Sequence, residues 1–346
     1  MYWGKGLIKF KEREVRFNMK SFLIKRLLLM VPTLLIISII AFAIIQLPPG
    51  SYVNTLVSQL AQSGHEVSQA QIQALEQRYG INRPIYAQYY IWMRNIILNQ
   101  DFGYSFIWQA PVNRVIGSRL MLTIIVSSAT LFFTWLVALP IGIISAVKQY
   151  SLTDYSVTFI GFLGLSIPNF MLALVLMFIG FRYFGISVGG LFSEEYLDAS
   201  WSIARFLDML KHLWIPVIVV GTARTAGLIR IMRANLLDEL HKPYVVSARA
   251  KGVAETVMLI KYPVRVAINP LLSSIGWMLP QIISGVTITA IVLSLPTVGP
   301  ALLDALMAQD MYLAGTFILL ISFLTVVGTL LSDILLALAD PRIRYE

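Results

Sequence analysis

The sequence predicts an all-α membrane protein with six transmembrane helices and a helical insertion outside the membrane. Hydrophobic residues make up 57% of the 346 residues and charged residues 13%, about half the charged fraction usual in soluble proteins. Long uncharged stretches recur along the chain, and basic residues cluster at their ends. That clustering explains the net charge of +9 by orientation in a bilayer, so we expect no nucleic-acid partner.

Five uncharged stretches are long enough to cross a bilayer, which takes about 20 residues in a helix. They are Leu27–Leu47, Met121–Val147, Tyr155–Phe181, Val266–Leu303 and Met311–Ser332. The fourth is too long for one span, and the prolines and glycine at 296–300 predict that its helix ends near Ser294. A sixth candidate, Leu213–Leu237, is weaker because arginines at 224, 230 and 233 interrupt it.

Basic residues set the orientation of these spans. They are concentrated before residue 27 and between 224 and 265, whereas the 295–310 segment has none and the 182–212 segment is more acidic. Positive charge is retained on the cytoplasmic side, so both termini and the 224–265 segment are expected in the cytoplasm. Six spans agree with that parity, because an even number returns the chain to its starting side.

The predicted segments follow from these limits. In order, they are a cytoplasmic N-terminal segment (1–26), a first span (27–47), an extracytoplasmic helical insertion (48–118), two spans (119–147 and 155–185), an extracytoplasmic loop (186–211), a fourth span (212–240), a cytoplasmic loop (241–265), a fifth span (266–294), an extracytoplasmic loop (295–310), a sixth span (311–338) and a cytoplasmic tail (339–346). The first span is predicted to be an uncleaved anchor, because its apolar run exceeds the roughly 7–15 residues of a signal-peptide core.

The insertion is predicted to contain two helices. Ser68 can cap a helix over Gln69–Tyr79, and Pro84 can open a second helix near its first position. The second helix would carry one apolar stripe made of Ile85, Tyr89, Trp92 and Ile96. We interpret this module as structural packing in preference to a direct substrate contact.

The sequence lacks the motifs of common catalytic and metal sites. It contains no cysteine and no phosphate-binding loop of the G-x-x-x-x-G-K-[ST] type. The three histidines, His65, His212 and His241, are scattered and do not suggest a metal cluster. We therefore expect no catalytic residue, metal ligand or cofactor on this chain, and no enzymatic activity.

The segment 243–265 is the most informative stretch, because it is a charged, helix-forming run with a central glycine between two spans. Ala248 and Gly252 are four residues apart and would share one helical face, where small side chains allow a partner's backbone to approach closely. Three charged side chains could form ion pairs with the partner: Arg249, Lys251 and Glu255. The alternative is that Gly252 simply ends one short helix before another.

Four motifs, which follow one another along the chain in the family's order, resemble the oligopeptide/dipeptide family of ABC-importer permeases. Residues 244–252, YVVSARAKG, are similar to that family's Y-V-x-x-A-R-A-K-G coupling segment, with matches at Ala248, Arg249, Ala250, Lys251 and Gly252. In the wider superfamily the motif is E-A-A-x-x-x-G, and here Val246 and Ser247 replace its first two letters. The other three resemblances lie at 79–105 (YGINRP, then DFGYS), at 165–170 (LSIPNF) and at 338–345 (LADPRIRY).

The resemblance implies the type I ABC-importer permease arrangement and a role as the membrane half of an ATP-driven pump that works by alternating access. It implies two ATPase subunits or domains that bind ATP and Mg, an extracytoplasmic solute-binding protein, and a second permease that is usually a different chain. The coupling residues would be Ala248, Arg249, Ala250, Lys251, Gly252 and Glu255. The chain would reside among the lipids of a bacterial or archaeal cytoplasmic membrane.

Candidate pathway residues begin with Arg224, because a charge inside a span costs about 2.5–3.5 kcal/mol. It should line a cavity, or reach the headgroups from the cytoplasmic third of the helix. Further candidates, for which packing or helix bending is an equal explanation, are Pro168, Asn169, Trp277 and Gln281.

The segment near 290 departs from the family, which usually carries a glutamate followed by S-W-P-G-L-G. Here Ala290 replaces the acid, Leu295 the tryptophan and Thr297 the first glycine, and Ala290 is for that reason also a candidate pathway residue. Because an acid would suit a cationic peptide amine, its absence favours a neutral cargo, which could be an oligosaccharide as well as an oligopeptide.

Two other classes of transporter are alternatives. An ion-gradient-driven secondary transporter would need buried acids within its spans, and the sequence suggests only Asp333 near the edge of a span. A passive channel would not need the charged loop at 243–265.

Overall fold

The computed structural model describes residues 19–46, 83–105, 107–185, 189–197, 199–284 and 287–339. The helices in these ranges are α1 (Met19–Gln46), α4 (Ile85–Asn99), α5 (Val112–Val147), α6 (Leu152–Ser166), α7 (Asn169–Phe184), α8 (Ile203–Leu240), α9 (Pro243–Ala250), α10 (Glu255–Lys261), α11 (Pro263–Ala267), α12 (Asn269–Ser284), α13 (Thr287–Val292), α14 (Val298–Met307) and α15 (Met311–Ala339). A short 3₁₀ turn covers Glu194–Tyr196, and the strands β1 (Tyr104–Ser105) and β2 (Ala110–Pro111) form one antiparallel hairpin. The all-α prediction is confirmed, whereas the helix expected at 69–79 lies outside the described residues.

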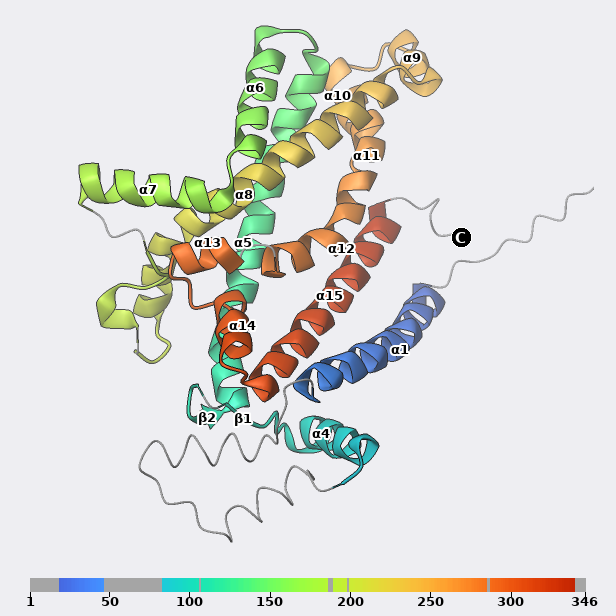
Figure 1. The fold of residues 1–346 in the computed structure, drawn as a ribbon. Coiled ribbons are helices and arrows are strands. Elements are labelled where there is room, and N and C mark those ends of the chain that lie inside the picture. Colours follow the sequence, from blue (N-terminus) through green and yellow to red (C-terminus); the bar gives the residue numbers. More distant parts are fainter. Residues whose placement is uncertain are drawn as a thin grey trace, which may run out of the picture.

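Within the part of the chain that the structure describes, four helices are long and apolar enough to cross a membrane: α1, α5, α8 and α15. The core of the molecule is the packing of α8 on α5 and of α12 on α15 (Figure 1). Glycines allow both approaches, because a Cβ added at Gly142 would lie 2.8 Å from the Cβ of Met232, and one at Gly276 would lie 3.3 Å from the Cα of Thr329. The backbone of α5 at Gly142 therefore lies against a side chain of α8, and the backbone of α12 at Gly276 lies close to that of α15.

The predicted third span is not one helix. The chain forms α6 and α7 instead, bent by 98° at Ile167 and Pro168, so that α7 lies across the bundle (Figure 1). Pro168 has no N–H to continue the hydrogen bonds of α6, and its ring favours the extended backbone seen at Ile167 (φ −86°, ψ 119°). If the bent pair counts as one span, the described helices give five candidate spans.

The predicted fifth span, 266–294, is also broken. It consists of the end of α11, then α12 and α13, and prolines at positions 263 and 270 mark the starts of α11 and α12. With 16 residues, α12 is about 24 Å long, which is less than the roughly 30 Å of a bilayer core. The count of six spans therefore stays a prediction.

Three helices begin earlier than their apolar stretches, and α1 is the first, since it begins at Met19 and not at 27. α5 begins at Val112 and not at 119, and α8 begins at Ile203 and not at 212. The side chain of Ser202 caps α8 by accepting a hydrogen bond from the backbone N–H of Arg205. Hydropathy marks only the apolar part of a helix, whereas the cap marks where the helix starts.

The helix that follows Pro84 packs on α1 and α15 at the lower end in Figure 1. Trp92 is buried there, and the hydroxyl of Tyr89 lies 2.6 Å from that of Ser38 on α1. The predicted apolar stripe is correct for Tyr89, Trp92 and Ile96, which join this core. It is wrong for Ile85, which is 66% exposed because it precedes the contact.

Candidate functional site

The informative segment forms a helix–turn–helix element, α9–α10, at the upper end of the molecule in Figure 1. Gly252 ends α9 with φ +74°, a conformation that favours glycine. Its N–H donates to the carbonyl of Arg249 at 2.9 Å, and the N–H of Val253 donates to the carbonyl of Ala248 at 3.3 Å. This pair of hydrogen bonds is a Schellman motif, so the predicted helix–glycine–helix shape is confirmed.

The α9–α10 element has a small hydrophobic core of its own. Val245, Ala248 and Met258 are buried, and Val253 packs against them. The expectation that Ala248 and Gly252 share a face open to a partner is therefore wrong. Ala248 faces inward, and Gly252 lies past the end of α9, where its role is the positive φ of the turn.

Charged side chains on this element pair with each other. Arg249 Nη2 lies 2.6 Å from Glu255 Oε1, and both side chains are about half exposed or more. The hydrogen bonds from Arg249 hold the pKa of Glu255 below its usual value. The expectation that both residues face partner charges needs correction, since the pair instead closes the turn. Ala250 and Lys251 remain exposed.

The α9–α10 element is joined to the spans through the end of α8. Two turns before that end, Arg233 binds Asp154 of α6 with two hydrogen bonds, Nε to Oδ1 and Nη2 to Oδ2, each 2.7 Å long. The carboxylate also accepts the hydroxyl of Ser145 on α5 and the N–H of Tyr150, and Asp154 is 2% exposed. One buried acid thus ties together the end of α5, the start of α6 and the end of α8.

The sequence reasoning missed this ion pair. From the sequence, Arg233 is only one of the basic residues at a cytoplasmic end, and Asp154 has no assigned role. The available signal was local: Ser151 caps α6 by accepting the N–H of Asp154, which places an acid in the first turn of a span. The expectation that Asp333 is the only acid near a span is therefore wrong, because Asp154 lies in the first turn of α6.

Arg224 points from α8 to α12. Its Nη2 donates to the backbone carbonyl of Gln281 at 2.9 Å, and its Nη1 lies 3.4 Å from the Oε1 of the same residue. Gln281 is among the last four residues of α12, whose carbonyls have no partner within the helix. The structure thus brings two of the pathway candidates together in one contact between helices.

The remaining candidates lie apart from that contact. Pro168 and Asn169 form the bend between α6 and α7. One turn earlier, Gly164 packs against Thr222 of α8, the residue two positions before Arg224. Trp277 lies in α12, but its side chain is outside the described part of the chain.

Ala290 is buried, with 4% exposure, among the apolar side chains of α13 and its neighbours. The side chain at this position therefore packs within the chain. Its neutrality is a feature of the core, and it gives no information on the charge of a cargo.

No group of His, Asp or Glu that could hold a metal ion occurs within the described ranges. The acids found near spans have partners of their own. Asp154 pairs with Arg233, Asp333 with Arg26, and Asp208 accepts hydrogen bonds from Ser193. These contacts give no support to the ion-driven alternative, which needs acids open to an ion.

Two family models match most of the chain. "Binding-protein-dependent transport system inner membrane component" matches residues 138–345, and "Binding-prot-dependent transport system membrane comp, N-term" matches residues 19–127. The boundary between the two matches falls within α5. The α9–α10 element lies within the match at residues 138–345.

Similar proteins align along nearly the whole chain. The oligopeptide transport system permease protein AppB of Bacillus subtilis (strain 168) is 34% identical over 329 residues, which cover 94% of this chain and 100% of AppB. The di/tripeptide transport system permease protein DppB of Pseudomonas aeruginosa (strain UCBPP-PA14) is 30% identical over 345 residues, with 95% and 100% covered. The dipeptide transport system permease protein DppB of Escherichia coli (strain K12) is 28% identical over 346 residues, with 95% and 100% covered.

With two matching family models and full-length relatives at this identity, the chain belongs to the binding-protein-dependent transport system inner membrane components, in the oligopeptide/dipeptide branch of ABC-importer permeases.

Proposed function

We propose that this permease moves short peptides into the cytoplasm by alternating access, driven by ATPase subunits that dock on the α9–α10 element. The main support for this proposal is the structure of the element itself. It has its own core, and it leaves Val246 (57% exposed), Val257 (54%) and Ile260 (62%) on its outside. Exposed apolar side chains beside charged ones suit a protein partner.

The proposed cargo is an oligopeptide. AppB and both DppB proteins are named as oligopeptide, di/tripeptide or dipeptide permeases, and no relative reported above favours a sugar. The oligosaccharide alternative rested on Ala290, and that side chain is buried in the core. We therefore do not retain it.

The proposed route of transmission runs from α9 to α8 and across the Asp154–Arg233 pair. A bidentate arginine–carboxylate pair fixes both distance and direction, so a movement of the end of α8 would carry the α5–α6 turn with it. Arg224 and Gln281 would pass the same movement to α12. The chain would thus respond to the ATPase at several spans at once.

The partners follow from the family. We propose a second, different permease chain, two ATPase subunits or domains that bind ATP and Mg, and an extracytoplasmic solute-binding protein. The α9–α10 end and both termini would face the cytoplasm, and the α4 end would face outward. This chain itself would bind no nucleotide.

Co-purification with the ATPase subunits tests the docking role. Val246→Glu places a charge on the outside of α9 and should reduce the amount of co-purified ATPase and the peptide-stimulated rate of ATP hydrolysis. Ile203→Glu is a matched control, since Ile203 is 82% exposed at the far end of α8. Equal amounts of ATPase with both variants would refute docking at α9–α10.

A further inference from the structure

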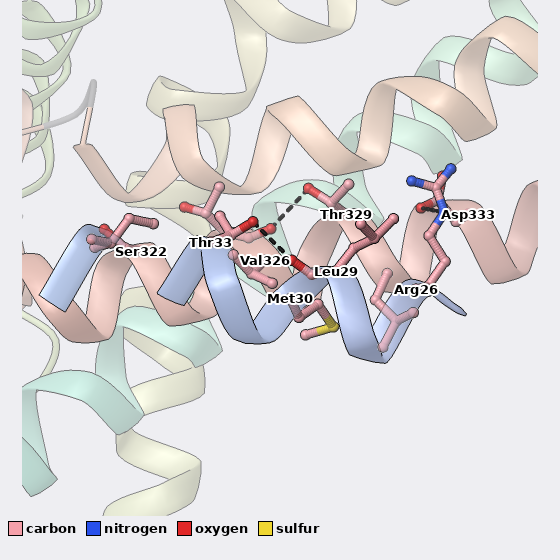
Figure 2. Close-up of a pocket in the computed structure, with 11 residues that line it drawn as sticks. Arg26, Leu29, Met30, Thr33, Ser322, Val326, Thr329 and Asp333 are labelled. Atoms are coloured by element: carbon pink, nitrogen blue, oxygen red, sulfur yellow. Dashed lines mark hydrogen bonds and ion pairs between the residues drawn. The ribbon is translucent and has the colours of Figure 1, made fainter. Parts of the chain in front are cut away.

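α1 and α15 form a wedge: they share a core at one end and stand farther apart toward the other (Figure 1). At the end with the shared core, Ala41 and Phe42 of α1 join the same core as Leu313 and Phe317 of α15. Toward the start of α1 the helices are no longer in that core, and a cavity of about 350 Å³ lies between them (Figure 2).

The walls of this cavity are largely apolar. Its lining includes Leu29, Met30 and Ile37 from α1 and Val326 and Leu330 from α15. The three threonine hydroxyls that line it donate to carbonyls of their own helices: Thr33 to Leu29 at 3.0 Å, Thr325 to Ile321 at 2.8 Å and Thr329 to Thr325 at 3.0 Å. A hydrocarbon chain therefore fits these walls better than a polar solute.

An ion pair spans the wider end of the wedge, from α1 to α15 (Figure 2). Arg26 Nε lies 3.1 Å from Asp333 Oδ2, and the two side chains are 45% and 20% exposed. A ligand headgroup arriving here meets a guanidinium and a carboxylate side by side. A zwitterion complements both, because its anion can accept from Arg26 while its cation donates to Asp333.

The cavity is also open to the side that would face lipid. Leu29, which lines it, is 62% exposed, and Leu28 next to it is 64% exposed. In a membrane protein such side chains face hydrocarbon. An acyl chain could thus enter the wedge from the bilayer while its headgroup stays at the surface.

We propose that the α1–α15 wedge binds one phospholipid with a zwitterionic phosphoethanolamine headgroup. The phosphate is held by Arg26, the ammonium by Asp333, and one acyl chain lies between Met30 and Val326. The lipid fills the space that the helices leave and fixes α1 on the bundle. This site is independent of the proposed cargo and of the ATPase.

Native mass spectrometry of the purified importer complex tests the site. The complex is stripped of lipid in detergent and titrated with dioleoylphosphatidylethanolamine or dioleoylphosphatidylglycerol. Wild type should hold one phosphatidylethanolamine molecule about tenfold more tightly than phosphatidylglycerol, because the latter has no ammonium. Equal affinity for both lipids would overturn the headgroup assignment.

Two variants separate the cavity from general lipid binding. Val326→Trp fills the wedge and should remove the tight site, whereas Val327→Trp, one position away and outside the lining, should keep it. Met30→Phe fills the cavity from the opposite wall and serves if Val326→Trp does not assemble. Equal retention of lipid in the filling variants and in Val327→Trp would refute the site.

The occupant can be checked directly, because the chain has no cysteine. A cysteine at Val326 should not cross-link to the second permease chain if a lipid lies there. An efficient cross-link would show that a protein helix fills the wedge, and it would overturn the proposal. These experiments measure lipid binding and cross-linking but not transport, so either result is independent of the proposed function.

Discussion

The α9–α10 element and the opposite end of the molecule are each organised around a carboxylate, but over very different distances along the chain. Glu255 pairs with Arg249, six residues away, and both side chains are exposed. Asp310, at the start of α15, is fully buried and accepts the hydroxyl of Ser105 at 2.6 Å, from 205 residues away. The N–H of Ile107 also donates to it.

This difference separates two mechanical roles. Because α9–α10 has a local ion pair and a core of its own, it can keep its shape while its outer surface binds a partner. A buried acid that joins the β1–β2 hairpin to α15 instead makes that end part of the global fold. Changes at α9–α10 should therefore alter coupling more than stability, and changes around Asp310 should do the reverse.

The largest expected effect concerns the sides of the membrane on which the two ends lie. A cysteine at Tyr86, which is 76% exposed on α4, should react with an impermeant thiol reagent in intact cells. A cysteine at Ser247 on α9 should react only after the cells are opened. Labelling of both cysteines from outside would show that α4 and α9 lie on the same side of the membrane, and it would refute the predicted topology.

Next in size is the loss of the carboxylate that anchors the end of α8. Asp154→Ala leaves Arg233 without its partner and should destabilise the purified protein by about 3 kcal/mol, the lower end of the range for broken buried pairs. We choose the lower end because the Arg233 side chain retains 27% exposure. Thermal unfolding measures the change.

The double variant Asp154→Leu/Arg233→Met tests what the pair does beyond stability. Removing both charges should restore most of the lost stability, while peptide uptake stays low because the directional link between α6 and α8 is gone. Full recovery of uptake together with stability would reduce the pair to a packing role.

Asp310→Ala should lower stability by about 1–3 kcal/mol, because buried donors lose their acceptor. Asp304→Ala is the matched control: it removes an exposed acid from the same end and should change stability by less than about 0.5 kcal/mol. The folded fraction of Asp310→Ala should keep normal coupling of ATP hydrolysis to uptake. A coupling defect at full folding would show that this end also transmits movement.

Gly252→Ala should act locally. A side chain at φ +74° costs about 1 kcal/mol, so amide hydrogen exchange in α9 and α10 should speed up about fivefold, with little change elsewhere. Gly252→Asn should cost less, since asparagine tolerates this conformation. Equal exchange in wild type and Gly252→Ala would indicate that alanine adopts the positive φ at position 252 without cost.

The smallest expected effect is the pH dependence of the Arg249–Glu255 pair. Because Arg249 lowers the pKa of Glu255 from its usual 4.5, the pair stabilises the element above that pH, and this contribution is lost as pH falls through the lower folded value. Protection of α9 and α10 amides should decline slightly more on acidification in wild type than in Glu255→Gln. The same decline in both would assign it to other groups.

The sequence alone determined the features that depend on neighbours along the chain. Apolar length predicted α1, α5 and α15 and, more weakly, α8; Pro84 predicted the start of α4; and Gly252 predicted the break between α9 and α10. Each rests on a property of a few adjacent residues: the cost of exposing polar backbone in a bilayer, a missing N–H, or a permitted positive φ. The family resemblance added the rest of the prediction.

Tertiary structure decided what distant residues do to one another. Pro168 could signal a break, but its 98° angle is set by where α7 finds packing against α8 and α13. The pairing of Asp154 with Arg233 joins residues 79 positions apart, and no local pattern specifies it. Likewise, whether Ala248 faces a partner or its own core depends on Met258, because a helical period fixes which residues share a face but not what that face meets.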